Sequence, residues 1–329
     1  MVEHQPHELV RSLTNAAVGA RCLQVVAELG VADAVGPEPT SVEVLAERCG
    51  GDVDALDRVL RLLVASGVFA RQGRRYCHTA ASELLRSDHP MSMRAFSRMM
   101  GSPMVLDSFA SLATSVRTGS PGMAEIEPRG MWAYFETRPD EEKVFGEAMS
   151  AKGAADVVAV LNAYDFRDVG VLADIGGGRG HLLRAVLDAA PCAHGVLVDL
   201  PAVIDQLEVG HDRLEPVAAD FFVDPLPAAD AYLLMDVLHD WPNQEAAAIL
   251  AAIRRAASPG ARVLVIENVL EDEAPDLRGH TLDVVMLAVT GGRERTVTEL
   301  SALLAEAGFG RTTVHPTSGP IRVVEAHLG

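Results

Sequence analysis

The stretch that most constrains the fold runs through residues 171–181, where an apolar segment meets a run of glycines. Residues 169–175 are apolar except for Gly170 and Asp174, which predicts a buried strand. Gly-Gly-Gly-Arg-Gly follows at 176–180, and a helix-like segment begins directly after it. Such a turn lets backbone N–H groups approach a ligand at the carboxyl edge of a parallel sheet. The stretch therefore predicts a nucleotide-type site on an α/β sheet.

Two acidic residues indicate which class of nucleotide-binding site this is. A glycine-rich turn alone is a weak signal, because dinucleotide-binding enzymes use a similar one. Here, however, Asp174 stands two residues before Gly176, and a second acid, Asp199, ends the next apolar segment. This D-x-G-x-G-x-G pattern resembles the first motif of S-adenosylmethionine-dependent methyltransferases. A dinucleotide fold and a strand–turn–helix without a ligand stay open as alternatives.

Charge and composition exclude several classes of protein. The 329 residues are 49% hydrophobic and 22% charged, which suits one large globular domain with a smaller one. The 28 basic and 46 acidic side chains leave a net charge of −18. This field repels phosphate backbones, so we expect no nucleic-acid partner.

Cysteine usage and apolar runs bear on the compartment. The four cysteines (Cys22, Cys49, Cys77 and Cys192) lack metal-ligand spacing and suit free thiols in a reducing environment. No apolar run reaches the roughly 18 residues that indicate a membrane span, and no basic-then-apolar signal opens the chain. We expect a cytoplasmic protein without a membrane partner.

The N-terminal part predicts helices followed by a hairpin. Apolar residues recur at helical spacing up to Gly30, and Thr40 with Glu43 resembles a capping box for a helix over 42–48. Asp52 or Asp54 can cap a further helix that ends at Gly67. Residues 68–76 then form a hairpin with Gln72-Gly73 at its turn.

This order is typical of a winged helix, for which DNA binding is one interpretation. The candidate recognition helix is expected to expose Asp54 and Asp57, and residues 1–100 carry 11 basic and 12 acidic side chains. A DNA reader should be strongly basic here. A role in dimerisation or as a substrate lid is therefore favoured.

Residues 91–165 predict helices that are rich in methionine and aromatic side chains, with a loop over 119–130. Such side chains suit a pocket for a flat apolar ligand, although ordinary helix packing also explains them.

From residue 169 onward, strands alternate with helices. We expect strands at 170–175, 195–199, 215–218, 230–236 and 261–267, helices at 180–189, 201–208, 243–257 and 277–288, and a last strand pair near 311–315 and 321–327. This alternation predicts an α/β, Rossmann-like, mostly parallel sheet. The last strand pair resembles the reversed hairpin that closes the sheet of methyltransferases. The expected domains are a winged-helix-like dimerisation domain (1–95), a helical linker and pocket region (96–165) and a methyltransferase domain (166–329).

His239 is the strongest candidate for a catalytic group. It follows the fourth strand, so it lies at the ligand-facing edge of the sheet. Its ordinary pKa of ~6.5 leaves it largely neutral at pH 7, as a general base requires. Asp240, just before Pro242, can cap the next helix, and a structural histidine is the alternative for His239.

The run Leu-His-Asp-Trp at 238–241 makes the resemblance more specific. It resembles the plant-type small-molecule O-methyltransferases and their bacterial relatives, which methylate phenols of natural products. The stretches Val265-Ile-Glu267-Asn, Asp283-Val-Val-Met286-Leu, Gly291-Gly-Arg-Glu294-Arg-Thr296 and Phe145-Gly-Glu-Ala-Met149-Ser are also similar to that family. The resemblance runs from about residue 10 to the C-terminus.

The resemblance implies S-adenosylmethionine as cofactor, with S-adenosylhomocysteine as product. Asp199 would hold the ribose hydroxyls, Asp220 the adenine amine, and Phe221 the adenine ring. The full implied cofactor set is Asp174, Gly176, Gly178, Gly180, Asp199, Leu200, Asp220, Phe221, Met235 and Trp241.

The resemblance also implies the chemistry. His239 would be the base, with Glu267 and Glu294 beside it; solvated surface acids are the alternative for these two glutamates. The implied acceptor pocket consists of Met100, Phe145, Met149, Asp236 and Met286. A metal is not required, and no metal-ligand spacing is visible in the sequence.

Two departures separate this chain from the plant members. Met235 stands where they often have lysine, and the run from Met149 to Gly153 reads Met-Ser-Ala-Lys-Gly instead of Met-Ser-Asp-His-Ser. Both departures match bacterial members and weaken any inference about the acceptor.

The resulting prediction is a homodimeric O-methyltransferase that acts on a small aromatic hydroxyl compound. N-methylation of a heteroaromatic compound, a relative that binds the cofactor without transferring methyl, and a DNA-binding regulator are the alternatives.

Overall fold

The computed structural model describes residues 5–207, 210–271 and 275–329. The chain divides into two compact units, one of residues 1–106 with 139–152 and the other of residues 107–138 with 153–329. The division into three domains stays a prediction.

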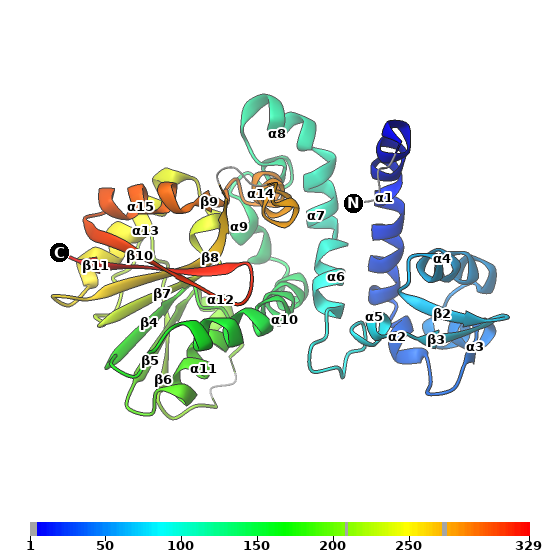
Figure 1. Cartoon of the computed structure of the whole chain (residues 1–329), viewed down its shortest axis with the longest axis horizontal. Coiled ribbons are helices and arrows are strands. Elements are labelled where there is room, and N and C mark those ends of the chain that lie inside the picture. Colours follow the sequence, from blue (N-terminus) through cyan, green and yellow to red (C-terminus); the bar gives the residue numbers. More distant parts are fainter. Residues whose placement is uncertain (1–4, 208–209, 272–274) are drawn as a thin grey trace. The chain divides into compact units, whose positions relative to one another are not determined.

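The first unit contains the predicted helices and hairpin (Figure 1). Its helices are α1 (Pro6–Glu28), α2 (Val31–Ala34), α3 (Val42–Cys49), α4 (Val53–Ala65), α5 (Ala80–Glu83), α6 (Arg94–Met100) and the first part of α10 (Pro139–Ala163). Its strands are β1 (Thr40–Ser41), β2 (Phe69–Gln72) and β3 (Arg75–His78), in the order β1-β3-β2. Apolar residues from the helices and the hairpin form one core.

Two details of this unit differ from the sequence-based expectation. Ser41, not Thr40, caps α3, because the Ser41 hydroxyl accepts from the Val44 N–H while Thr40 binds within its own loop. Asp57 is buried rather than exposed on α4. It accepts a 2.7 Å hydrogen bond from the Tyr76 hydroxyl, which attaches the helix to the small sheet.

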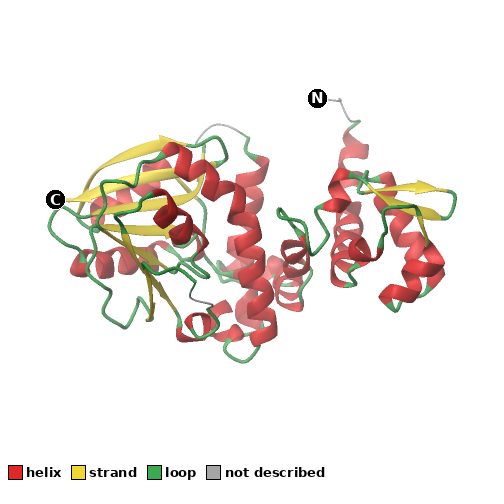
Figure 2. Ribbon diagram, turned by 90° about the horizontal axis from the view of Figure 1, so that it is seen from below, coloured by secondary structure: helices red, strands yellow, loops and turns green. Residues whose placement is uncertain are grey.

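The second unit is a sheet with helices on both faces (Figures 1 and 2). Its strands are β4 (Val171–Ile175), β5 (His194–Asp199), β6 (Leu214–Ala218), β7 (Ala231–Met235), β8 (Arg262–Leu270), β9 (Arg295–Thr296), β10 (Phe309–Pro316) and β11 (Ile321–Leu328). The order is β10-β11-β8-β7-β4-β5-β6, with β9 paired to β8. The β10–β11 and β11–β8 pairings are antiparallel, and the other pairings in this sheet are parallel. This confirms the Rossmann-like sheet closed by a reversed hairpin.

The helices cover the two faces with separate apolar cores. One core joins the sheet to α13 (Asn243–Ala256) and α15 (Val297–Glu306). The other joins it to α11 (His181–Ala189) and the last part of α10. Because β4 is central and buried on both faces, its carboxyl end lies in the middle of the sheet edge.

The remaining elements refine the prediction for this unit. They are the last part of α7 (Pro103–Ala110), which begins in the first unit, and α8 (Leu112–Thr118), η1 (Gly122–Glu125), α9 (Met131–Phe135), α12 (Pro201–Ile204), η2 (Leu238–Asp240) and α14 (Leu277–Val289). The helix expected over 201–208 was too long, and residue 208 lies outside the described residues. The expected loop over 119–130 contains η1. Strand β9 and helix α15 were not predicted. Among the described residues, no helix has the length and apolarity to cross a membrane.

Candidate active site

The glycine-rich turn lies at the carboxyl end of β4. Gly176, Gly178 and Gly180 have φ of 67°, 57° and 71°, a region that favours glycine. The Gly176 N–H donates to the Val198 carbonyl (2.8 Å), which joins the turn to β5. A Cβ at Gly177 would lie 2.5 Å from the Asp174 carboxyl carbon, so no side chain fits there. The turn is therefore a tight backbone cradle with α11 starting behind it.

Asp199 is attached to this cradle from the neighbouring strand. Its Oδ2 accepts from the Gly178 N–H and its Oδ1 from the Leu200 N–H, both at 2.7 Å. The carboxylate is half-buried. The two acids that the sequence singled out therefore meet at one edge, because β4 and β5 are parallel neighbours.

Asp174 is a buried acid beneath the turn. Asp174 is only 1% exposed. Neither of its carboxylate oxygens has a hydrogen-bond partner of normal geometry among the described residues. Burial, and then the charge of Asp199, raise the pKa of Asp174 to about 7, and the Leu183 N–H opposes this only weakly. An unpaired buried carboxylate is costly, so this position favours a ligand that brings donors or positive charge.

An aromatic cluster stands beside the cradle. Phe221 and Phe222 both pack edge-on against Trp241, with centroids 5.9 and 4.7 Å away. The Phe221 ring also lies near Gly176, 3.6 Å from the position of a Cβ there. Asp220 accepts from the Phe222 N–H (2.8 Å) and so orders this segment. The sequence singled out Phe221 and Trp241 but not Phe222.

The second half of the site is the turn that follows β7. Asp236 has φ of 53°, the one non-glycine residue with positive φ among the described residues. The short turn η2 then carries His239, which is 4% exposed. Its backbone N–H donates to Glu267 Oε1 (3.0 Å), and its Nδ1 lies 2.7 Å from Glu294 Oε1.

Both glutamates are buried rather than solvated. Glu267 comes from β8, and Glu294 directly precedes β9; each is 1% exposed. The Glu294 N–H donates to Asp283 of α14 (2.9 Å). The structure thus brings His239, Glu267 and Glu294 together from segments far apart in the sequence.

The acids around His239 change its protonation. Burial opposes the imidazolium, but Asp240, Glu294 and Asp236 outweigh it and raise the pKa of His239 to about 10. The expectation of a largely neutral histidine at pH 7 was wrong, because the sequence does not reveal how many acids converge on it. Burial is also the main reason that the pKa of Glu267 is raised to about 7.

Asp240 does not cap α13. The residue at the cap position is Pro242, and no side chain caps the helix. The Asp240 carboxylate instead lies 3.8 Å from His239 Nε2. The capping prediction was wrong because η2 holds Asp240 against the histidine and the chain turns at Pro242.

The remaining candidates belong to both units. Met100, Phe145 and Met149 lie half-buried in the first unit. Met286 is buried on α14, half-buried Met235 ends β7, and half-buried Asp236 follows it. A common acceptor pocket formed by these residues stays a prediction.

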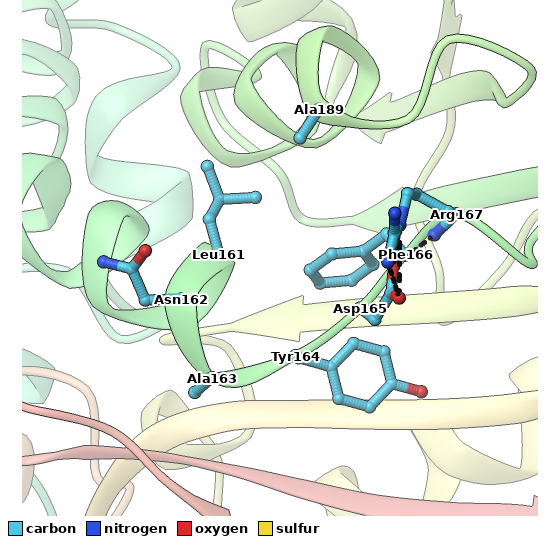
Figure 3. Close-up of a pocket in the computed structure, with 8 residues that line it drawn as sticks. All are labelled: Leu161, Asn162, Ala163, Tyr164, Asp165, Phe166, Arg167 and Ala189. Atoms are coloured by element: carbon cyan, nitrogen blue, oxygen red, sulfur yellow. Dashed lines mark hydrogen bonds and ion pairs between the residues drawn. The ribbon is translucent and has the colours of Figure 1, made fainter.

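A hollow of about 400 Å³ lies elsewhere on the second unit (Figure 3). It is lined by residues 161–167 and Ala189, which precede β4 and end α11. These segments lie at the amino edge of the sheet, away from the cradle. The charged side chains in it, Asp165 and Arg167, pair with each other at 2.7 Å. We therefore place the candidate site at the carboxyl edge.

A buried arginine was missed by sequence reasoning. Arg295 follows Glu294 directly and is 1% exposed. Its guanidinium donates to the carbonyls of Leu238 and Trp241, both at 2.7 Å. The sequence signal that could have identified it is its position directly after the candidate Glu294 and directly before Thr296, whose side chain caps α15. Within the described ranges, no group of three or more metal-binding side chains is assembled.

Known proteins resemble this chain along most of its length. Residues 109–310 match the O-methyltransferase domain family, and residues 12–88 match the O-methyltransferase dimerisation domain family. Mitomycin biosynthesis 6-O-methyltransferase of Streptomyces lavendulae is 34% identical, over 97% of this chain and 93% of the relative. The 8-amino-8-demethylriboflavin N,N-dimethyltransferase of Streptomyces davaonensis is 36% identical, over 92% and 90%.

A solved structure shows the same fold with ligands. It is an O-methyltransferase from neocarzinostatin biosynthesis in complex with S-adenosylmethionine and 2-hydroxy-5-methyl naphthoic acid. It superposes with a TM-score of 0.82 at 35% identity and covers 94% of this chain and 96% of its own.

The buried Asp174 predicts a pH-dependent stability. Its folded pKa of about 7 exceeds the ordinary 3.8, so the folded state binds the extra proton and loses stability as pH rises toward 7. Replacing Asp174 with Asn removes this loss. The stability gained by Asp174→Asn should grow by about 2 kcal/mol between pH 5.5 and 8.5, since one pKa unit corresponds to about 1.4 kcal/mol.

Thermal unfolding at the two pH values measures this difference. Asp165→Asn is the control, because Asp165 is exposed and Arg167 lowers its pKa to about 2. An equal change in melting temperature for Asp174→Asn at both pH values would contradict the prediction.

Proposed function

Because the chain belongs to the family of S-adenosylmethionine-dependent O-methyltransferases, we propose that it methylates a hydroxyl group of an aromatic secondary metabolite, with His239 as general base. The observation that carries this proposal is the buried hydrogen bond between His239 Nδ1 and Glu294 Oε1. Because Nδ1 is held in this bond, the other ring nitrogen, Nε2, is the one that would accept the proton. No metal takes part in the proposed reaction.

The residues at the carboxyl edge fit the cofactor. Bound S-adenosylmethionine supplies a methyl group on a positively charged sulfur, already activated for displacement. The unpaired carboxylate of Asp174 and the acids around His239 favour a cation at this edge. We propose that the cradle glycines Gly176, Gly178 and Gly180 contact the cofactor, that Asp199 and Leu200 bind its ribose, and that Asp220, Phe221, Met235 and Trp241 surround its adenine and methionine parts.

His239 would take the proton from the acceptor hydroxyl. A carboxylate only accepts hydrogen bonds, so Nδ1 carries the proton in the contact with Glu294. The raised pKa keeps the ring as an imidazolium, so Nε2 must lose its proton before His239 can act as base. A cation bound at this edge would lower that pKa and favour the neutral ring, with its lone pair at Nε2. A phenol has a pKa of ~10 and is a poor nucleophile at pH 7. A base with a raised pKa removes that proton with little loss of free energy. Glu294 would orient the ring and stabilise its charged form.

The acceptor pocket and the oligomer complete the proposal. We propose that Met100, Phe145, Met149, Asp236 and Met286 line the pocket, and that two copies pair through the dimerisation domain. Apolar side chains exposed on α1 support the pairing: Leu9, Val10, Leu13 and Val18 are 48% to 69% exposed. The cytoplasmic location stays a prediction.

N-methylation is a second candidate, because one relative is named as an N,N-dimethyltransferase. A nitrogen nucleophile with a free lone pair needs no base for its attack. The two candidates therefore differ in their dependence on His239. The buried triad of His239, Glu267 and Glu294 favours the oxygen acceptor.

Replacing His239 with Ala tests the base assignment. Because the substitution removes the proposed proton acceptor, O-methylation should fall by at least about 100-fold, within the range for loss of a general base. Mass spectrometry of phenols, hydroxynaphthoates, anthraquinones and phenazines incubated with S-adenosylmethionine measures the added methyl group. Calorimetry should show cofactor affinity within a few-fold of wild type. Equal methyl gain by both proteins would contradict base-assisted O-methylation.

Chelation tests the metal-free reaction. No metal supplies charge in the proposed mechanism, so turnover should be unchanged in EDTA. The control is the same assay with added Mg²⁺ and no chelator. Activity that EDTA removes and Mg²⁺ restores would place the chemistry in a different class.

A further inference from the structure

Arg295 is the largest fully buried side chain in the described part of the chain. A buried charge is costly unless it is paired and hydrogen-bonded. All three contacts of this guanidinium go to the segment 238–243. Nη1 donates to the Leu238 carbonyl (2.7 Å), Nη2 to the Trp241 carbonyl (2.7 Å) and Nε to the Asn243 side chain (3.1 Å). The segment that one arginine spans is the segment that carries His239.

This segment has little internal structure to hold it. It begins after the strained Asp236 and contains a three-residue turn, and the helix after it has no side-chain cap. Positive φ at a non-glycine residue persists only where the surroundings enforce it. The support must therefore come from outside the segment.

The residues before Arg295 contact the backbone of the same turn. The Arg293 N–H donates to the His239 carbonyl (2.8 Å). A Cβ at Gly292 would lie 2.0 Å from that carbonyl oxygen, so the two backbones are in direct contact. Residues 292–295 thus form a strap over the His239 turn. Among the described residues of this strap, Glu294 and Arg295 are the two whose side chains hydrogen-bond to the turn.

The strap is also fixed to the strand that carries Glu267. Arg295 pairs with Val269 in the parallel ladder between β9 and β8. The backbone of Arg295 is therefore attached to β8 two residues after Glu267. Its side chain binds the carbonyls of Leu238 and Trp241, one on each side of His239 in the chain. Burial lowers the pKa of Arg295, and the charges of Glu267 and Glu294 partly oppose this.

We propose that Arg295 is a positioning residue of this enzyme, which fixes the turn 238–243 against β8 so that His239 stays in register with Glu267 and Glu294. The inference rests on the proposed role of His239 as base. Arg295 touches none of the reacting atoms and acts through the turn. Arginine suits this task, because its planar fork can satisfy three acceptors at once, whereas a lysine ammonium cannot match their arrangement.

The test compares Arg295→Lys with Arg293→Lys. Both variants keep the charge, and Arg293 is the matched control because its side chain is 49% exposed and pairs with Glu299 at the surface. Hydrogen exchange of the peptide 237–243 reports local opening of the turn, and the peptide 171–180 reports the cofactor cradle. The turnover number and the cofactor dissociation constant are measured on the same proteins.

We expect Arg295→Lys to speed exchange of the His239, Asp240 and Trp241 amides, whose partners lie in or against the turn, and to leave the cradle unchanged. The turnover number should fall by about 10- to 100-fold, because a displacement of ~1 Å at a catalytic group can cost about 100-fold. Cofactor affinity should stay within about threefold, and Arg293→Lys should match wild type.

Two results would overturn the inference. In one, Arg295→Lys keeps both the exchange and the turnover of wild type. In the other, exchange rises equally at 171–180 and cofactor binding is lost, which would make Arg295 a general stability residue. Activity retained by His239→Ala would instead refute the base assignment, and the exchange data would still decide whether Arg295 holds the turn.

Discussion

The site depends on one buried interaction, the hydrogen bond between His239 Nδ1 and Glu294 Oε1. It joins the turn after β7 to the segment before β9, which are 55 residues apart in the chain. Removing one partner of a buried charged pair leaves the other without compensation, at a cost of about 3–5 kcal/mol. The fold supports the pair from three sides: Glu267 binds the histidine backbone, Asp283 orders Glu294, and Arg295 spans the turn. Glu294 therefore contributes to both the geometry and the protonation of the proposed base.

Several acidic side chains are gathered at this edge of the sheet. Asp174 and Glu267 have raised pKa values, chiefly through burial, and the acids around His239 stabilise its imidazolium. Such an arrangement costs stability in the protein, which natural sites retain where function needs it. A cationic cofactor would relieve this cost, so the electrostatics and the family membership point to the same ligand.

The sequence allowed most of this architecture to be predicted. Alternating apolar segments and turn glycines indicated the parallel sheet, and the spacing of Asp174 and Asp199 placed both acids at neighbouring strand ends. Local patterns could not show which polar residues are buried. The sequence pattern predicts Asp57 as a surface acid, but it is buried against the Tyr76 hydroxyl of the hairpin. The pattern also predicts Asp240 as a helix cap, but the turn places it beside His239. Arg295 was missed for the same reason, since its partners lie some 50 residues earlier in the chain. Long-range contacts of buried polar groups leave no periodic signal.

The protonation of His239 is the most direct test of this account. Nitrogen-15 NMR of histidine-labelled protein, with the His239 signals assigned by their loss in His239→Ala, reports the tautomer and the pKa. We expect a protonated Nδ1 and a pKa of His239 well above 6.5 in wild type, and a lower pKa in Glu294→Gln, because the Glu294 charge no longer stabilises the imidazolium. A His239 that titrates near 6.5 in both proteins would contradict it.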